Sequence, residues 1–134
     1  MRLRQFINPQ QLAFIQELSK GEEGDFYLDK LIEIQDLINT MPKTYQTDDM
    51  GDAAPISLHY FIGGCDFWIT ERDKIDEEQS QAFGFSCLHG DTDNAELGYI
   101  SIVELLECNV ELDLYWDTTT TIGDIRQSME RRAA

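Results

Sequence analysis

A change of hydrophobic period after Pro55 restricts the fold more than any other feature of this sequence. From residue 56 to residue 62 every even position is apolar, and this period of two predicts a strand with one buried face. Gly63-Gly64 follows and is typical of a tight turn. Residues 66–70 then form a second run rich in aromatic and β-branched side chains. The segment therefore predicts an antiparallel hairpin.

Three more strands are expected after the hairpin. Residues 82–88 and 96–100 are separated by a turn rich in Gly and Asp, so we expect them to be antiparallel neighbours. Residues 110–116 alternate again and predict a fifth strand, with Glu111 and Asp113 on its solvent face. Together these segments predict a meandering antiparallel sheet of about five strands.

Two helices are predicted before the sheet. Asn8 is a good N-cap, a proline occupies the first helical position, Gln11 lies where a capping-box partner would, and Gly21 supplies a stop. Asp25 can cap a second helix that ends near Asn39. Its apolar residues recur at spacings of four, three and four, which is the stripe of an amphipathic helix packed on an apolar surface.

Two further helices are predicted in the second half of the chain. Ser101 and Glu104 have the spacing of a capping box and favour a short helix that continues to about residue 107. Thr121 and Asp124 can open a last helix. It ends in Arg131 and Arg132, cations that suit a helix C-terminus.

The order of these elements predicts an α+β fold with two N-terminal helices, a short helix inserted among the strands and a C-terminal helix. A length of 134 residues favours a single domain over residues 1–134. Within it, residues 1–40 form a helical N-terminal extension and residues 41–134 the α+β core. The polar stretch from Pro42 to Pro55 is expected to be a mobile loop.

The charge of the chain bears directly on the class of partner. Asp and Glu number 26 against 10 Lys and Arg, which gives a net charge of −16. Proteins that bind nucleic acid or anionic membranes depend on Lys and Arg, so this composition argues against both classes. No Lys or Arg lies between Lys74 and Arg126. Such a stretch is either a solvated acidic face or a surface whose carboxylates imitate DNA phosphates.

On the second interpretation the carboxylates occupy the Lys/Arg groove of another protein. If so, Glu111 and Asp113 should join carboxylates of the 76–78 segment or of the 91–96 turn in one continuous patch. The predicted partner-binding residues are Asp76, Glu77, Glu78, Asp91, Asp93, Glu96, Glu111 and Asp113.

The three cysteines are widely spaced and form no C-x-x-C pair. We expect reduced and mostly buried thiols, as in a cytosolic protein. The first six residues lack the apolar core of a signal peptide, and no apolar run is long enough to cross a membrane. The expected location is the cytoplasm.

Some of the same carboxylates are also candidates for metal binding or for nuclease activity. The pattern Asp91-x-Asp93-Asn94-x-Glu96 offers oxygen ligands for calcium, although Asp91 and Asn94 are equally expected as turn formers. A metal-dependent nuclease or phosphodiesterase would use the carboxylates Asp66, Glu71 and Asp73, with Asp91 and Asp93 as further candidates. His59 is expected to be a surface or hydrogen-bonded strand residue. We therefore predict no catalytic residue, no metal site and no cofactor.

Several segments resemble a family of small domains of unknown function that plasmids, phages and other mobile elements carry. They are 41–45 (MPKTY), 59–71 (HYFIGGCDFWITE), 83–85 (FGF), 94–101 (NAELGYIS) and 104–105 (EL). The resemblance covers roughly residues 41–117. It implies a genetic setting near antirestriction or conjugation genes. Some members carry a label that implies a single-stranded-DNA endonuclease, with no catalytic residues that map onto this chain.

One segment departs from the pattern of the family. Members often end the fifth strand with a basic residue before an acidic one, whereas residues 112–115 contain no Arg. The surface here is correspondingly more acidic.

Charge and resemblance together predict an acidic, non-enzymatic inhibitor from a mobile genetic element. It would bind a basic nucleic-acid-binding protein or nucleoprotein complex of the host, such as a CRISPR effector or a restriction enzyme, and block its nucleic-acid site. We expect no direct contact with nucleic acid or membrane. The alternatives are the nuclease or phosphodiesterase and a generic acidic protein-interaction domain.

Overall fold

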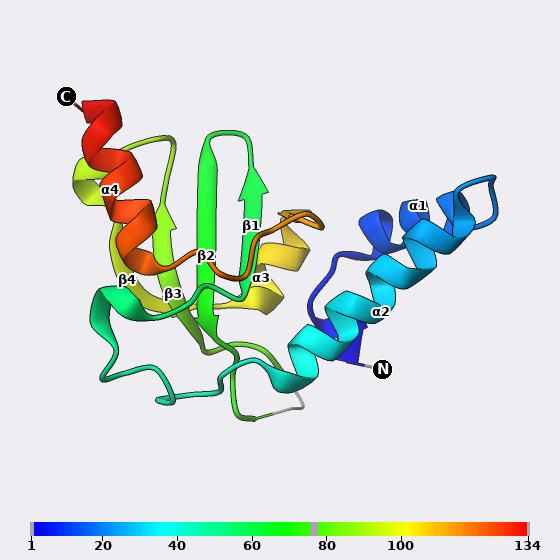
Figure 1. Ribbon diagram of the computed structural model, residues 1–134, viewed down its shortest axis with the longest axis horizontal. Helices are drawn as coiled ribbons and strands as arrows, with labels where there is room; N and C mark the ends of the chain where they lie inside the picture. The colour runs from blue at the N-terminus through cyan, green and yellow to red at the C-terminus, as the bar shows by residue number, and fades with distance from the viewer. Residues whose placement is uncertain (1, 76–77, 134) are drawn as a thin grey trace.

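A computed structural model describes residues 2–75 and 78–133 and has an α+β fold, as the sequence predicts (Figure 1). The strands form one antiparallel sheet in the order β4-β3-β2-β1-β5. The α-helices and strands are α1 (Pro9–Leu18), α2 (Gly24–Thr40), β1 (Leu58–Ile62), β2 (Cys65–Glu71), β3 (Ala82–Cys87), β4 (Glu96–Ile100), α3 (Ile102–Glu107), β5 (Glu111–Leu112) and α4 (Ile122–Ala133).

The predicted hairpin is the centre of the sheet. In the register of β1 with β2, Ile62 pairs with Cys65 across the two-glycine turn and Leu58 pairs with Ile69. Strand β3 continues the meander, and its Gly84 lies against the backbone of β2. A Cβ at this position would lie 2.0 Å from the carbonyl oxygen of Trp68, so only glycine fits.

One face of the sheet packs against the N-terminal segment before α1, the second half of α2 and α3. Tyr60 of β1 is fully buried there, and its hydroxyl donates a hydrogen bond to the carbonyl oxygen of Phe6. The core of this face combines β1 and β2 with helical residues such as Ile38 of α2 and Ile102 of α3. Burial of this apolar face holds the N-terminal extension onto the sheet.

The other face is covered by α4 and by the segment that leads into β1. Figure 1 places α4 beside β3 and β4, and the α1–α2 pair beyond the opposite edge of the sheet. A second, smaller core lies under α4 and contains Trp68, Phe85, Ile122 and Met129. The sheet therefore separates two cores, and a residue that packs with α3 lies on the opposite face from one that packs with α4.

Helix caps follow the sequence in part. The side chain of Asn8 accepts a hydrogen bond from Gln11 N at 2.7 Å, and Ser101 accepts one from Glu104 N at 3.2 Å. The prediction that Asp25 caps α2 is wrong. The helix begins at Gly24 with Glu23 as N-cap, and no side chain caps it. Gly24 lies too close to the Ser19 carbonyl for any other residue, which fixes the entry of the helix.

Strand β5 is shorter than the alternation predicts. It pairs with β1 only through Leu112 with Tyr60 and Glu111 with Phe61. The next residue, Asp113, accepts a hydrogen bond from Tyr115 N at 3.0 Å. This local turn between a side chain and the backbone two residues later competes with the ladder and ends the strand.

The segment from Pro42 to Pro55 is fastened to the sheet. Backbone N–H groups of Tyr45 and Thr47 donate to the carboxylate of Glu71 at 2.9 and 2.8 Å. Short 3-10 turns complete the chain at Arg2–Gln5, Gly51–Ala53 and Thr92–Asn94. In the described ranges, no helix combines the length and the hydropathy needed to cross a membrane.

The cysteines are free, but the expectation of mostly buried thiols is wrong. Only Cys87 is buried, whereas Cys65 is half-buried and Cys108 is exposed. Cys108 directly follows α3, where the chain turns towards β5 and has no covering element.

Candidate functional site at one end of the sheet

The register of the strands gathers acidic residues at the end of the sheet that holds the β1–β2 turn. Glu111 of β5 pairs with Phe61 of β1, which pairs with Asp66 of β2, which in turn pairs with Cys87 of β3. These four residues form a row straight across four strands. Because neighbouring strands lie about 4.8 Å apart, the backbones of Glu111 and Asp66 are about 10 Å apart.

The turn between β3 and β4 adds three carboxylates at the same end. Gly90 N donates a hydrogen bond of 3.0 Å to the carbonyl oxygen of Gly64, and this bond joins the turn to the β1–β2 turn. Glu96 opens β4 and pairs with Ser86, one residue before Cys87. We call this region the acidic end and define it by Asp66, Asp91, Asp93, Glu96 and Glu111.

Several of these carboxylates are unengaged. Within the described ranges, the side chains of Asp93, Glu96 and Glu111 are exposed and form no hydrogen bond or ion pair. Asp91 is also exposed, and its Oδ2 accepts a hydrogen bond from Asn94 Nδ2 at 2.7 Å. This hydrogen bond stabilises the turn, which is the role expected of Asp91 and Asn94 if they do not bind calcium.

The negative charges of the acidic end affect a buried thiol on β3. Burial raises the pKa of the Cys87 thiol, and the negative charges of Asp66 and Asp91 raise it further. Arg132 in the last turn of α4 lowers the same pKa. The stretch without cations in the sequence therefore has a cation near it in space, because α4 returns along the sheet.

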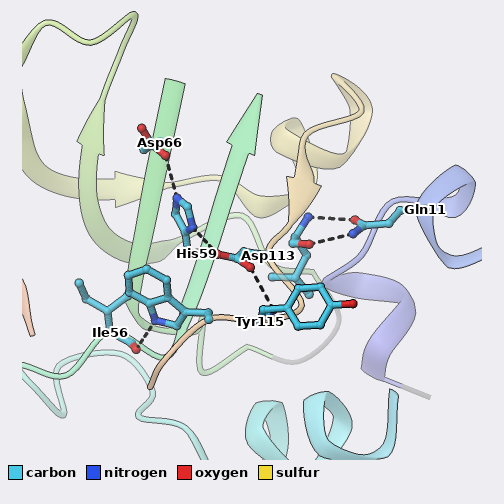
Figure 2. Close-up of polar contacts among 8 residues, drawn as sticks. Gln11, Ile56, His59, Asp66, Asp113 and Tyr115 are labelled. Carbon is cyan, nitrogen blue, oxygen red and sulfur yellow. Dashed lines mark hydrogen bonds and ion pairs between the residues drawn. The ribbon is translucent and has the colours of Figure 1, made fainter. Parts of the chain in front are cut away.

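His59 holds two carboxylates together next to the acidic end (Figure 2). Its Nε2 lies 2.8 Å from Asp66 Oδ1 and its Nδ1 lies 3.0 Å from Asp113 Oδ2. The ring lies parallel to Trp68 at 10° and is tilted against Trp116, with centroid separations of 5.6 and 4.9 Å. We call this group the His59 centre.

The His59 centre joins three strands. Asp66 lies on β2, His59 on β1 and Asp113 directly after β5, and Asp113 N also donates to the carbonyl oxygen of His59 at 2.8 Å. Both ring nitrogens face carboxylate oxygens, so neither is left to act as a base on a substrate. The centre fastens the short β5 to the sheet and engages one carboxylate oxygen of Asp113.

The remaining predicted partner-binding residues belong to the 76–78 segment. Asp76 and Glu77 lie outside the described residues. Glu78 lies beyond the far end of β2, in a hollow with Arg4 of the N-terminal turn and Val103 of α3. The structure therefore brings Asp91, Asp93, Glu96 and Glu111 to one end of the sheet, places Asp113 at the His59 centre beside them, and separates Glu78 from them.

Two carboxylates considered for a nuclease are buried and fully engaged by the chain. Glu71 Oε2 accepts hydrogen bonds from Thr47 N and Thr47 Oγ1 at 2.8 and 2.6 Å, and its Oε1 accepts one from Tyr45 N. Asp73 accepts hydrogen bonds from the backbone N–H groups of Ile75 and Gln81. These carboxylates organise loops, and in the described part of the chain no group of three or more His, Cys, Asp or Glu could hold a metal ion.

The sequence contains a partial indication of the His59 centre. Across a two-residue turn, His59 and Asp66 are diagonal neighbours on one face of the hairpin, within reach of each other. The contact with Asp113 was not predictable, because nothing in the sequence places β5 beside β1. Comparisons with protein-family models, with curated proteins and with solved structures found no match.

Proposed function

We propose that this protein is a non-enzymatic acidic inhibitor that binds a basic nucleic-acid-binding partner through the acidic end. The observation that carries the proposal is the position of Asp91, Asp93, Glu96, Glu111 and Asp66 along one end of the sheet. The overall charge of −16 adds a long-range attraction to any basic surface.

The state of these carboxylates suits a contact with Lys and Arg. Asp93, Glu96 and Glu111 are exposed and have no internal partner among the described residues, so they can meet a cation without first breaking a bond within the protein. The carboxylates are attached to strand ends and a tight turn, so little backbone conformational freedom is lost on binding. The cations that they contact would otherwise hold phosphates, and the protein would therefore compete with nucleic acid.

The partner class follows from the resemblance to a family carried on mobile elements. Such elements meet host defence complexes that grip nucleic acid through basic grooves. We therefore propose a CRISPR effector or a restriction enzyme as the partner and the cytoplasm as the place of action. The nuclease alternative lacks a comparable observation, since Glu71 and Asp73 serve the fold.

The test is a charge reversal with a matched control. The double variant Asp91→Lys with Asp93→Lys changes the acidic end, and Asp29→Lys with Asp36→Lys makes the same change of charge at exposed positions on α2. Both should remain folded, because surface substitutions usually change stability by less than about 0.5 kcal/mol each. The readout is inhibition of purified CRISPR effectors and restriction enzymes, with DNA added before or after the protein.

We expect the first variant to lose inhibition and the α2 variant to keep it. DNA added first should protect the partner, because both ligands need the same cations. Full inhibition by the Asp91 and Asp93 variant, or a panel in which no partner is inhibited, would contradict the proposal.

A further inference from the structure

A pocket of about 310 Å³ lies on the α4 side of the sheet, away from the acidic end. It opens between the segment 42–57, the paired strands β3 and β4, and the start of α4. Its walls include the rings of Tyr45, Phe83 and Tyr99 and the aliphatic side chains of Leu97 and Ile122. This volume lies near the lower limit of small-molecule sites, which is about 300 Å³.

The aromatic rings are arranged around the mouth. Tyr99 lies edge-on to Phe83, with centroids 5.8 Å apart, and its hydroxyl lies 3.4 Å from that of Tyr45. Tyr45 and Tyr99 are 60% and 57% exposed, so the two rings stand open to solvent rather than filling the core. The aromatic faces of these rings are therefore available to a ligand in the pocket.

Tyr45 is held in a costly backbone conformation. Its φ of 69° lies in the left-handed region, which side chains other than glycine rarely adopt. The hydrogen bond from Tyr45 N to Glu71 Oε1 fixes this conformation and directs the ring to the pocket. Strain of this kind at the mouth of a pocket is typical of functional sites.

A buried carboxylate also lines the pocket. Glu71 lines it and is only 3% exposed, and among the described residues it forms no ion pair with Lys or Arg. The hydrogen bond with Tyr45 raises the pKa of Tyr99, and the negative charge of Glu71 raises it further. The second carboxylate of the lining, Asp48, is exposed.

Glu71 provides charge rather than a hydrogen-bonding edge. Three N–H and O–H donors of the chain already occupy its oxygens, and a carboxylate has about four acceptor positions. A guanidinium, which needs two parallel hydrogen bonds to a carboxylate, is therefore poorly matched. A cation that needs no hydrogen bonds, surrounded by aromatic faces, is well matched.

We propose that this pocket binds a quaternary ammonium group. The rings of Tyr45, Phe83 and Tyr99 would contact its methyl groups, and the buried carboxylate of Glu71 would supply the opposite charge. The ring of Tyr45 already has a cation near it, since Lys74 Nζ lies 5.9 Å from the ring centroid. The inference goes beyond the proposed function and does not depend on it, because the acidic end and the pocket share no residue.

The test compares two probes that differ only in charge. Choline carries a trimethylammonium group, and 3,3-dimethylbutan-1-ol has the same shape with a neutral carbon in place of nitrogen. Each is titrated into the full chain while NMR follows the ring signals of Tyr45, Phe83 and Tyr99. We expect saturable shifts with choline and at least tenfold weaker binding of the neutral alcohol.

Three variants identify the site. Tyr99→Ala should weaken choline binding at least tenfold, whereas Tyr99→Phe keeps the ring and should stay within about threefold, as rings differ modestly in their attraction for cations. Tyr115→Ala removes an exposed tyrosine that stacks on Phe26 of α2, outside the pocket, and should change nothing. Equal binding of the two probes, shifts away from the three rings, or unchanged binding by Tyr99→Ala would overturn the proposal.

A peptide with one trimethyl-lysine separates the two sources of this group. Competition between the peptide and choline would identify a methylated protein as a source. Binding of choline alone would identify a small molecule. Both results support the ammonium site, and loss of binding to both probes would refute it without affecting the test of the acidic end.

Discussion

His59 links carboxylates from two other parts of the sheet, Asp66 of β2 and Asp113 after β5. The imidazole separates Asp66 from Asp113 and bonds to both, while its side chain is only 13% exposed. Without the ring, two carboxylates would face each other at the junction of β1, β2 and β5.

We therefore predict that His59→Ala lowers the free energy of unfolding by about 1–3 kcal/mol, because it removes two side-chain hydrogen bonds worth about 0.5–1.5 kcal/mol each. Urea unfolding measures it. His89→Asn is the control, because His89 is exposed and asparagine tolerates its positive φ of 55°. A cost for His59→Ala no larger than that of the control would show that the His59 centre does not hold the sheet.

Tyr60 gives a pH dependence of known sign. Complete burial raises its pKa far above the ordinary 10.0, so the folded protein keeps the phenol proton after the unfolded chain has lost it. Stability is then fully present below pH 10 and falls above it by about 1.4 kcal/mol per pH unit for this one proton. Urea unfolding at several pH values above 10 measures how steeply the free energy of unfolding falls with pH. In Tyr60→Phe this fall should be shallower by the contribution of one proton. An unchanged slope would contradict this account.

At the scale of elements, Gln11 shows how side chains complete the sheet. Its Oε1 accepts a hydrogen bond from Leu112 N at 2.9 Å and its Nε2 donates one to Leu112 O at 2.8 Å. The amide thus acts as a one-residue strand on the free edge of β5, as Figure 2 shows. Capping-box spacing had suggested a bond back to Asn8, and the amide serves β5 instead.

Gln11→Ala should lower the free energy of unfolding by roughly 1–3 kcal/mol for two hydrogen bonds. It should also speed the hydrogen exchange of the Leu112 amide. The neighbouring Gln10→Ala is a matched control, since Gln10 is exposed and forms no such bond. Equal exchange of Leu112 in both variants would exclude the role in the edge.

The same elements separate what the sequence could predict from what it could not. The hairpin, the β3–β4 pair and the caps at Asn8 and Ser101 depend on neighbours in sequence, and these predictions are confirmed. The length of β5 and its place beside β1 depend on contacts between residues about 50 positions apart, such as His59 with Asp113. Local patterns carry no information about such contacts.

The candidate site divides in the same way. Glu111 and the 91–96 turn lie at the same end of the sheet but at opposite edges, because the strand order places β5 and β4 outermost. The sequence left this order open. The burial of Glu71 and Asp73 was equally hidden, because acidic residues after a strand usually face solvent. Their structural role depends on backbone N–H groups of loops that are distant or irregular in the sequence pattern and that donate hydrogen bonds to them.

At the scale of the whole molecule, the net charge of −16 opposes the compact state. Of the described carboxylates only Glu71 and Asp73 are buried, so the remaining negative charge lies at or near the surface. Salt should therefore stabilise the fold. Raising the ionic strength from about 0.01 M to about 1 M shortens the screening length from about 30 Å to about 3 Å.

We expect the melting temperature to rise across this range in sodium chloride, and to rise less in the variant Asp29→Lys with Asp36→Lys, which has less charge to screen. Differential scanning calorimetry measures both. A melting temperature that falls with salt would mean that attractive ion pairs outweigh the repulsion, and the surface would not be a single-sign field.

The most direct test of the central claim is to identify the carboxylates that touch the partner. Carbodiimide treatment joins carboxylates to lysines in contact, and mass spectrometry of the complex with an inhibited partner locates the joined residues. We predict links from Asp91, Asp93, Glu96 and Glu111 to lysines of the nucleic-acid groove of the partner, and their loss when DNA is bound there. Links confined to the carboxylates of α1 and α2, or unaffected by DNA, would contradict the account.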